Sequence, residues 1–361
     1  MYETQLRKKK ITFFINSLDS GGSERQLLYL IRLLKKKFEI EIFSFKRGLL
    51  LNDFKKENIK IISADNNFFS FIFLVFYLFF NKSQIYHFIL PKSYIIVAIL
   101  SFFSKKKKVM SRRSLNYYHN KYYGMSLFVE KFLHKKMNHI LCNSEAIKKQ
   151  LIDLENVNAK KIKTIKNFYP VNKFIKSSLF EFSIKKNYVN FAYLANFIEY
   201  KGHVDLIKIC SNLKTKKNWN LFLVGKGSKR YINELKKIVK KKKLNSKIFF
   251  IGYINNPMEL YKKMDFAINC SNEEGSSNAL LEAISLSLPI ISFDVGGNSD
   301  FFSNNGYLIK YKDIKTFTES LDKLIESKEK KKLGKNSYLH FKKEFNNSKN
   351  LRKYEDIYLK F

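Results

Sequence analysis

The chain has 361 residues, which is enough for two domains of ordinary size, each with its own core. Its 68 lysines and arginines against 31 aspartates and glutamates give a formal net charge of +37, so a nucleic-acid-binding protein is the first class to test. The basic residues are almost all lysines spread over the whole chain, and no helix-turn-helix, zinc-finger or RNA-recognition motif accompanies them, which argues against nucleic acid as a partner.

Two explanations of the charge stay open. The abundance of Lys, Asn, Ile and Phe fits the codon bias of an A+T-rich genome, in which case the charge has no function. Alternatively, the lysines attract the protein to anionic lipid headgroups.

Cysteine usage and the N-terminal residues bear on the compartment. Cys142, Cys210 and Cys270 stand singly and without metal-ligand spacing, so we expect ordinary packing in a reducing compartment and no zinc site. The basic N-terminus is followed by an apolar run of only five residues, 11–15, which is too short for the core of a signal peptide. These features predict a cytoplasmic protein.

Short apolar runs typical of strands alternate with helical patterns along the chain. The predicted strands are 11–15, 39–45, 59–63, 84–88, 108–111, 139–142 and 161–165, then 188–194, 220–224, 247–251, 265–269 and 289–293. This alternation predicts an α/β fold with doubly wound parallel sheets. A polar stretch between Tyr169 and Asn187 divides the two groups of strands. We therefore predict an N-terminal domain over 1–170, a linker over 171–187, a C-terminal domain over 188–340 and a last helix over 341–361.

Two apolar stretches of the first domain bear on membranes. Residues 68–80 are almost wholly apolar and aromatic, but thirteen helical residues fall short of the about 20 that cross a bilayer. Residues 85–103 are interrupted by His87, Pro91 and Lys92. Because lysines flank both stretches, we expect the first domain to lie on an anionic membrane surface with aromatic side chains inserted. The alternative is a pair of ordinary core helices.

Two glutamates in the second domain surround a loop of small residues. Glu274 precedes the loop, and Glu282 lies in the helix that follows it. The loop residues that can bind or cap are Gly275, Ser276, Ser277 and Asn278. Backbone N–H groups at a helix start favour a phosphate or diphosphate. A carboxylate repels such an anion, so Glu274 is better suited to accept hydrogen bonds from sugar hydroxyls.

This segment resembles the signature of glycosyltransferase family 4, retaining enzymes of GT-B architecture whose two glutamates are separated by seven residues, as Glu274 and Glu282 are. Further similar segments follow in family order at 16–30, 142–151, 161–170, 195–209 and 221–230. The resemblance implies two Rossmann-like domains facing across a cleft. It also implies a nucleotide sugar as donor, which we expect to be UDP-linked.

The resemblance further implies the roles of individual residues. Glu274 and Lys201 are the expected catalytic residues, with Lys201 on the donor diphosphate, Glu274 on the donor sugar and Glu282 on the ribose. The expected donor-binding residues are Gly21, Gly22, Asn196, Lys201, Glu274, Gly275, Ser276, Ser277, Asn278 and Glu282.

The chain departs from the family pattern at two places. Asn196 stands where relatives usually have an arginine, so it supplies hydrogen bonds but no charge to a diphosphate. Many relatives have a histidine where this chain has Arg112 and Arg113. These arginines and His87, at the end of another strand, are candidates for the acceptor side. For His87 the alternative is a structural histidine with satisfied hydrogen bonds.

The glycine loop of the first domain connects a strand to a helix. Gly21 and Gly22 follow strand 11–15, and they let the backbone approach a ligand closely. The alternative is a tight turn without function. The following helix is predicted to begin near Ser23, which makes a capping box with Gln26.

These observations predict a retaining glycosyltransferase that moves a hexose or N-acetylhexosamine from a nucleotide sugar to a saccharide or lipid-linked acceptor in cell-envelope polysaccharide synthesis. The resemblance implies a same-face route without an enzymic nucleophile, cofactor or metal, and the chain has no Asp-x-Asp pair. We expect the protein at the inner face of the cytoplasmic membrane. Two rivals remain: an epimerase or phosphorylase of similar architecture, and a catalytically silent partner that binds sugar nucleotide, or a basic scaffold that binds lipid or nucleic acid.

Overall fold

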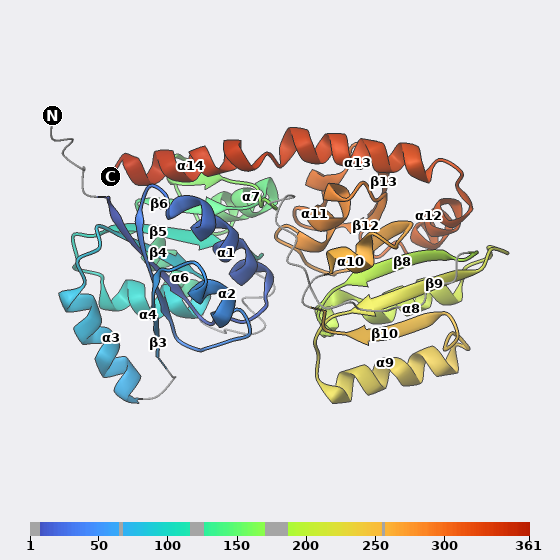
Figure 1. Cartoon of the computed structure of the whole chain (residues 1–361), viewed down its shortest axis with the longest axis horizontal. Helices are drawn as coiled ribbons and strands as arrows, with labels where there is room; N and C mark the ends of the chain where they lie inside the picture. Colours follow the sequence, from blue (N-terminus) through green and yellow to red (C-terminus); the bar gives the residue numbers. More distant parts are fainter. Residues whose placement is uncertain (1–7, 65–67, 116–125, 170–186, 255–256) are drawn as a thin grey trace. The chain divides into compact units, whose positions relative to one another are not determined.

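The computed structural model describes residues 8–64, 68–115, 126–169, 187–254 and 257–361. The chain forms two compact units (Figure 1). The first contains Met1–Phe168 and Asn347–Phe361, and the second contains Tyr169–Asn346. Apart from Asn187, the predicted linker 171–187 lies outside the described residues.

The first unit contains a seven-stranded parallel sheet in the order β3-β2-β1-β4-β5-β6-β7. Its strands are β1 (Lys10–Ile15), β2 (Glu39–Ser44), β3 (Lys60–Ser63), β4 (Ile85–Ile89), β5 (Lys107–Arg112), β6 (His139–Cys142) and β7 (Ile162–Thr164). Each corresponds to a predicted strand. Side chains of a strand alternate between its two faces, so Phe13 and Phe14 of β1 enter different cores.

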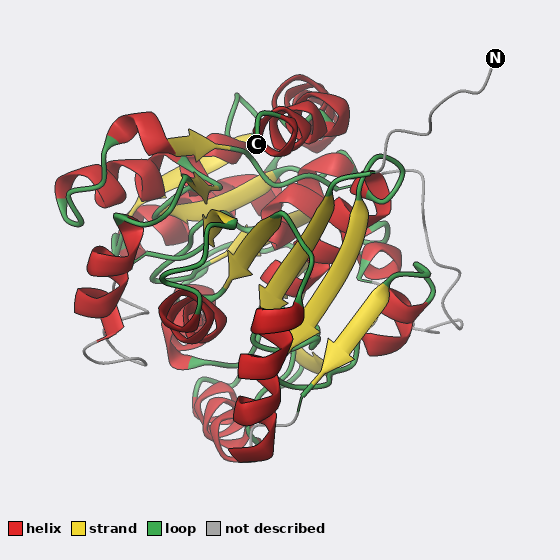
Figure 2. Cartoon of the chain, turned by 90° about the vertical axis from the view of Figure 1, so that its left-hand side faces the viewer, coloured by secondary structure: helices red, strands yellow, loops and turns green. Residues whose placement is uncertain are grey.

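Helices cover both faces of this sheet (Figure 2). The core that contains Phe13 is closed by α1 (Gly22–Leu34), α2 (Leu51–Lys55) and α14 (Asn347–Leu359). The core that contains Phe14 is closed by α3 (Phe68–Phe80), α4 (Pro91–Leu100), α6 (Ser126–His134) and α7 (Glu145–Asp153). A short 3-10 helix, η1 (Ala159–Lys161), precedes β7.

The second unit contains a six-stranded parallel sheet in the order β10-β9-β8-β11-β12-β13. Its strands are β8 (Val189–Leu194), β9 (Trp219–Val224), β10 (Ile248–Gly252), β11 (Phe266–Asn269), β12 (Ile290–Asp294) and β13 (Gly306–Lys310). Strand β13 was missed by the sequence prediction, because its five residues are short, half-exposed and flanked by polar loops. The remaining five correspond to predicted strands.

Helices also cover both faces of the second sheet. One core is closed by α8 (His203–Ser211), α9 (Lys229–Lys241) and α12 (Ile314–Glu326). The other is closed by α10 (Met258–Tyr261), α11 (Asn278–Ser285) and α13 (Lys330–Glu344). Two 3-10 helices, η2 (Glu199–Lys201) and η3 (Asn298–Phe301), follow β8 and β12.

The strand order reverses once in each sheet, between β1 and β4 in the first and between β8 and β11 in the second. The predicted fold class, two doubly wound Rossmann-like sheets, is confirmed. In such sheets ligands bind outside the carboxyl ends of the strands where the order reverses. The loops after these four strands are therefore the places to look for a site.

The C-terminal residues form two helices, α13 and α14, where one helix from Phe341 was predicted. Phe345, between them, packs in a core of the second unit, whereas Tyr358 of α14 packs in a core of the first. The break between α13 and α14 thus lies where the chain leaves a core of the second unit and continues to a core of the first.

The apolar stretch 85–103 is not a continuous helix. It forms the buried strand β4 and helix α4, which begins with Pro91 at its first position, where proline costs no hydrogen bond. Within the described part of the chain, none of the helices has the length and apolar character needed to cross a membrane.

A buried ion-pair network holds β5 to the segments around it. The Arg112 guanidinium, 1% exposed, donates to Glu130 of α6 and to Glu155, at 3.2 Å, after α7. His134 Nε2 donates to the second oxygen of Glu155 at 2.9 Å, and Tyr94 of α4 contacts the other nitrogen of His134 at 2.8 Å. Arg112 thus connects β5 directly to α6 and to the segment after α7, and His134 extends the network to α4 through Tyr94.

Removing the Arg112 side chain is expected to destabilise the first unit strongly. In Arg112→Ala two buried carboxylates lose their cation, which costs about 3–5 kcal/mol of unfolding free energy. Urea unfolding followed by circular dichroism measures the loss. Arg230→Ala is the matched control, because it removes an exposed pair with Glu234 and should change the free energy by less than about 1 kcal/mol. Equal effects of the two substitutions would contradict the role of the network.

Candidate active site

The loop after β8 is fixed to the loop after β11 by two backbone features. The Asn272 N–H donates to the Tyr200 carbonyl at 2.7 Å, in a loop that Tyr193 Oη of β8 also holds by donating to the Lys201 carbonyl at 2.6 Å. Gly202 has φ +66°, and a Cβ there would lie 2.0 Å from the Cys270 carbonyl oxygen. Only glycine permits both this conformation and this approach. The two loops that meet at the strand-order reversal are therefore held together before any side chain of the site is considered.

Lys201 and Glu274 form a direct ion pair at this junction. Lys201 Nζ lies 2.6 Å from Glu274 Oε1, and the side chains are only 15% and 13% exposed. Ser271 Oγ donates to the same oxygen at 2.8 Å, and Asn269 Nδ2 approaches it at 3.5 Å. Among the described residues, all these bonds end on Oε1 and none on Oε2. One carboxylate oxygen thus fixes the side chain, and the other remains for a hydroxyl donor.

The ion pair also sets the charge of Lys201. Burial lowers the pKa of the Lys201 ammonium, but the Glu274 carboxylate, together with Tyr200 and Glu273, outweighs burial and raises this pKa above its ordinary value. Lys201 is therefore a fixed cation at neutral pH, available to a second anion beside Glu274.

Helix α11 begins beside Glu274. Its N-cap is Ser277, one of the three residues offered by the sequence, and its Oγ accepts from the Leu280 N–H at 3.4 Å and from Asn269 Nδ2 at 3.1 Å. Gly275 is buried, whereas Ser276 and Asn278 are half-buried. Glu282 is buried within the helix. The N–H groups of the first turn give this end of the helix a positive electrostatic character.

Asn196 connects two loops of the same sheet edge. Its Oδ1 accepts from the Lys226 N–H at 3.2 Å, and the next residue, Phe197, donates its N–H to the Lys226 carbonyl at 2.6 Å. Asn196 is exposed, so its amide group is accessible while its oxygen fixes the loop.

In the first unit, helix α1 begins at Gly22 with Gly21 as its N-cap, and the predicted capping box is wrong. Gln26 instead bonds the backbone of Phe168, donating to its carbonyl at 3.0 Å and accepting from its N–H at 3.2 Å. A Cβ at Gly21 would lie 2.3 Å from Glu24 Oε2, so a larger residue there would require the Glu24 side chain to move.

Glu24 is a residue that the sequence analysis missed. It lies at the strand-order reversal of the first sheet, is 7% exposed and accepts from Ser17 Oγ at 3.3 Å. Burial raises its pKa to about 7, although its own N–H, Ser17 and Arg113 oppose the shift. A glutamate in the first turn of a helix is ordinarily exposed. Only the fold shows that this one is buried under the glycine loop.

The acceptor-side candidates of the first unit need correction. His87 is fully buried, and its Nδ1 and Nε2 bond Tyr358 Oη at 2.6 Å and Ser111 Oγ at 2.7 Å. Burial lowers its pKa to about 3, so it is a neutral core histidine. Arg112 is committed to its buried carboxylates. The half-buried Arg113, bonded to Asn167 at 3.0 Å and Tyr354 at 3.3 Å, stays a candidate.

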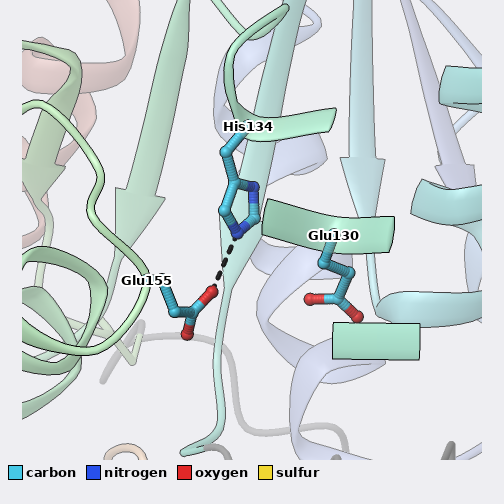
Figure 3. A group of neighbouring side chains, drawn as sticks. All are labelled: Glu130, His134 and Glu155. Carbon is cyan, nitrogen blue, oxygen red and sulfur yellow. Dashed lines mark hydrogen bonds and ion pairs between the residues drawn. The ribbon is translucent and has the colours of Figure 1, made fainter. Parts of the chain in front are cut away.

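The described residues include one cluster with metal-ligand geometry, Glu130, His134 and Glu155 (Figure 3). The guanidinium of Arg112 already bonds both carboxylates of this cluster. A metal ion there would have to displace or oppose this cation, so the cluster is an ion-pair network and not a metal centre.

The raised pKa of Glu24 predicts a pH-dependent stability difference. The folded-state pKa of about 7 exceeds the model value of 4.5, so ionisation of Glu24 costs stability as pH rises from about 4.5 to 7. Glu24→Gln lacks this cost, and its unfolding free energy is expected to exceed that of the wild type by up to about 3 kcal/mol above pH 7 and to match it near pH 4. Urea unfolding across this range measures the difference. Glu145→Gln, in the exposed first turn of α7, is the matched control and should show no such window. A pH-independent effect of Glu24→Gln would contradict the prediction.

Two family models match the chain in succession. Residues 20–173 match the model described as Glycosyltransferase Family 4, and residues 175–340 match Glycosyl transferases group 1.

Curated relatives are similar over nearly the whole chain. The chain is 24% identical over 352 residues to the N-acetylgalactosamine-N,N'-diacetylbacillosaminyl-diphospho-undecaprenol 4-alpha-N-acetylgalactosaminyltransferase of Campylobacter jejuni, which covers 91% of this chain and 93% of that protein. It is 25% identical to the capsular polysaccharide biosynthesis glycosyltransferase CapH of Staphylococcus aureus, over 88% and 91% of the two chains.

Solved structures share the fold. HepE of Anabaena, solved with UDP and glucose, has a TM-score of 0.85 at 17% identity and covers 98% of this chain and 100% of its own. With both family models matched in chain order and this two-unit fold, the chain belongs to glycosyltransferase family 4, whose members have the GT-B fold.

Proposed function

We propose that this protein is a retaining glycosyltransferase that moves a hexose or N-acetylhexosamine from a UDP-sugar to a saccharide or lipid-linked acceptor in cell-envelope polysaccharide synthesis. The observation that carries the proposal is the Lys201–Glu274 pair at the strand-order reversal, beside the start of α11. An ammonium, a carboxylate oxygen and helix N–H groups together suit a ligand that has both hydroxyls and a diphosphate.

In this proposal each group has one task. Glu274 Oε2 accepts hydrogen bonds from hydroxyls of the donor sugar, while Oε1 stays on Lys201 and Ser271. Lys201 and the N–H groups at the start of α11 bind the diphosphate, and Glu282 binds the ribose. The supporting donor-binding residues are Gly21, Gly22, Asn196, Gly275, Ser276, Ser277 and Asn278.

The reaction proceeds on one face of the sugar. The bond between the anomeric carbon and the diphosphate oxygen breaks, and the acceptor oxygen bonds the same carbon from the same face, so configuration is retained. The departing diphosphate oxygen takes the acceptor proton, and no side chain acts as nucleophile. Negative charge grows on the diphosphate in the transition state, where Lys201 and the helix start stabilise it more than in the ground state. The scheme uses these groups in place of a metal ion.

The names of relatives support the acceptor and donor classes. The Campylobacter relative acts on a sugar linked to diphospho-undecaprenol, and HepE was also solved with UDP-glucose. A lipid-linked acceptor of this kind lies in the membrane. In this proposal the enzyme is therefore a peripheral protein at the inner face of the cytoplasmic membrane.

Donor binding is the first test. Thermal unfolding with a set of UDP-hexoses and UDP-N-acetylhexosamines should show a rise in Tm with at least one of them, since ligand at a hundredfold its Kd adds about 3 kcal/mol. Lys201→Met should lose most of this rise, and also the rise with UDP alone, because the diphosphate contact is removed. No shift with any nucleotide sugar would refute the proposal. Binding without transfer to any saccharide or lipid-linked acceptor would identify a catalytically silent protein.

Glu274→Gln separates sugar recognition from nucleotide recognition. The amide cannot accept on both positions, so transfer is expected to fall by about a hundredfold or more. Binding of UDP alone should persist, because Glu274 contacts the sugar. Glu259→Gln, which breaks an exposed pair with Lys262 in the same unit, is the control and should leave transfer unchanged. Transfer at the wild-type rate by Glu274→Gln would rule out the assigned role.

A further inference from the structure

Helix α3 is apolar around its whole circumference but is buried on one side only. Among its described side chains, Leu74 is fully buried, and Tyr77 and Leu78 are half-buried against the same core. Phe79 is 83% exposed and Phe69 79%. A helix that is apolar on all sides is ordinarily enclosed by protein or by lipid. Protein encloses only one side of this one.

The neighbouring helices on the same face of the sheet continue this apolar surface. Phe103, directly after α4, is 95% exposed. Phe102 stacks on Phe132 of α6 with ring centroids 5.8 Å apart, and Phe128 lies one turn before Phe132 on the same side of α6. Lys106 Nζ donates to the Asn81 carbonyl at 3.1 Å, which joins the loop after α4 to the end of α3.

We call this surface the aromatic face, defined by the side chains that are most exposed on it. They are Phe69, Phe76, Phe79, Phe80, Phe103 and Phe128. Its helices α3, α4 and α6 all pack on the same core of the first unit (Figure 1). Exposed apolar side chains that gather on one face mark interaction sites in soluble proteins.

The chain segment that carries the aromatic face has charges of almost one sign. The sequence contains no aspartate or glutamate between Asp65 and Glu130, and Glu130 is buried on Arg112. Lysines follow the helices, including Lys82 after α3 and Lys105 and Lys106 after α4. Lys136 places its ammonium 4.5 Å from the centre of the Phe102 ring, so a cation and an aromatic ring share this edge.

A groove of about 410 Å³ lies beneath α3 and joins both properties. Its apolar wall includes Phe73, Phe76 and Phe80, and its polar wall includes three lysines. The lysines are Lys10, Lys60 and Lys82. Glu41 pairs with Lys10 at 3.1 Å and with Lys60 at 2.8 Å, and Glu39 also pairs with Lys10 at 3.2 Å, so these carboxylates leave Lys82 unbalanced. An aromatic wall with a surplus ammonium group matches the boundary between acyl chains and anionic headgroups.

A protein partner fits these observations less well than a bilayer. Protein interfaces are depleted in lysine relative to the rest of the surface. α3 has 13 residues, which is too short to cross a bilayer but sufficient to lie in its interface.

We propose that the aromatic face binds an anionic lipid bilayer, with α3 in the interface plane, its phenylalanines among the acyl chains and the surrounding lysines on the headgroup phosphates. The proposal rests on the proposed function only for its purpose, which is to bring the first unit to a lipid-linked acceptor. Membrane binding itself follows from the surface and does not depend on catalysis.

Vesicle sedimentation tests the proposal with the full-length protein. The wild type should sediment with vesicles of phosphatidylcholine and phosphatidylglycerol, less with phosphatidylcholine alone, and less in high salt. The variant Phe76→Ser, Phe79→Ser, Phe80→Ser should bind at least about tenfold more weakly, because it removes three inserted rings. Lys82→Glu with Lys105→Glu should reduce the preference for phosphatidylglycerol.

A matched control changes three exposed apolar side chains elsewhere: Leu49→Ser, Tyr311→Ser, Leu339→Ser. This variant should bind vesicles as the wild type does. Circular dichroism and thermal unfolding confirm that each variant is folded. Wild-type protein that stays in solution with both kinds of vesicle, or a triple phenylalanine variant that sediments normally, would overturn the proposal. So would a wild-type dimer that the phenylalanine variant converts to a monomer while neither binds vesicles, since the face would then join two copies of the chain.

The two proposals fail separately. Donor-dependent thermal stabilisation is measured without lipid, so the phenylalanine variant should retain it. Vesicle binding without any effect of a nucleotide sugar would support the membrane-binding face and contradict the proposed glycosyltransferase function. A nucleotide-sugar effect without vesicle binding would support the enzyme and contradict the membrane-binding face.

Discussion

The site of this protein depends on the close approach of two loops, after β8 and β11, at the strand-order reversal of the second sheet. Gly202, with its positive φ and its contact with the Cys270 carbonyl, lets the two backbones meet. Tyr193 adds a second link by bonding the Lys201 carbonyl and Ser271 Oγ. Because both loops are fixed, the Lys201 ammonium and the Glu274 carboxylate lie 2.6 Å apart, and both side chains are largely shielded from solvent. A preorganised pair of this kind needs little rearrangement to bind a ligand that has hydroxyls next to a diphosphate.

The first unit uses the same sheet topology with different chemistry. At its reversal point a buried carboxyl group, Glu24, lies against Gly21, and its burial raises the pKa to about 7. The second unit presents a carboxylate that is neutralised by a lysine instead. The two reversal points thus differ in how an acidic side chain is accommodated: one by desolvation, the other by pairing. Arg112, one of the expected acceptor-side residues, contributes to neither reversal point. Its guanidinium is paired with the buried carboxylates of Glu130 and Glu155.

The large positive charge and the exposed phenylalanines meet on one face of the first unit. The absence of acidic residues between Asp65 and Glu130 is a local property, which a uniform compositional bias towards lysine does not by itself explain. A bilayer interface is a solvent in which apolar rings and ammonium groups are stabilised at adjacent depths. The lysines of this face are accompanied by exposed aromatic side chains. This combination favours a lipid surface over nucleic acid as the partner of the positive charge.

The sequence by itself determined the strands, the order of the motifs and the family, because these depend on local periodicity and on residues close together in the chain. It predicted twelve of the strands and limited the cap of α11 to three residues that include Ser277, but it missed β13, which is too short and too exposed to give a clear pattern. Only the tertiary structure showed that His87 is a core histidine held by Tyr358, from a helix 271 residues away, and that Gln26 bonds Phe168 instead of capping its own helix. It also showed that Glu24 is buried and that Lys201 meets Glu274. Burial and pairing of this kind depend on segments distant in sequence, and no local pattern encodes them.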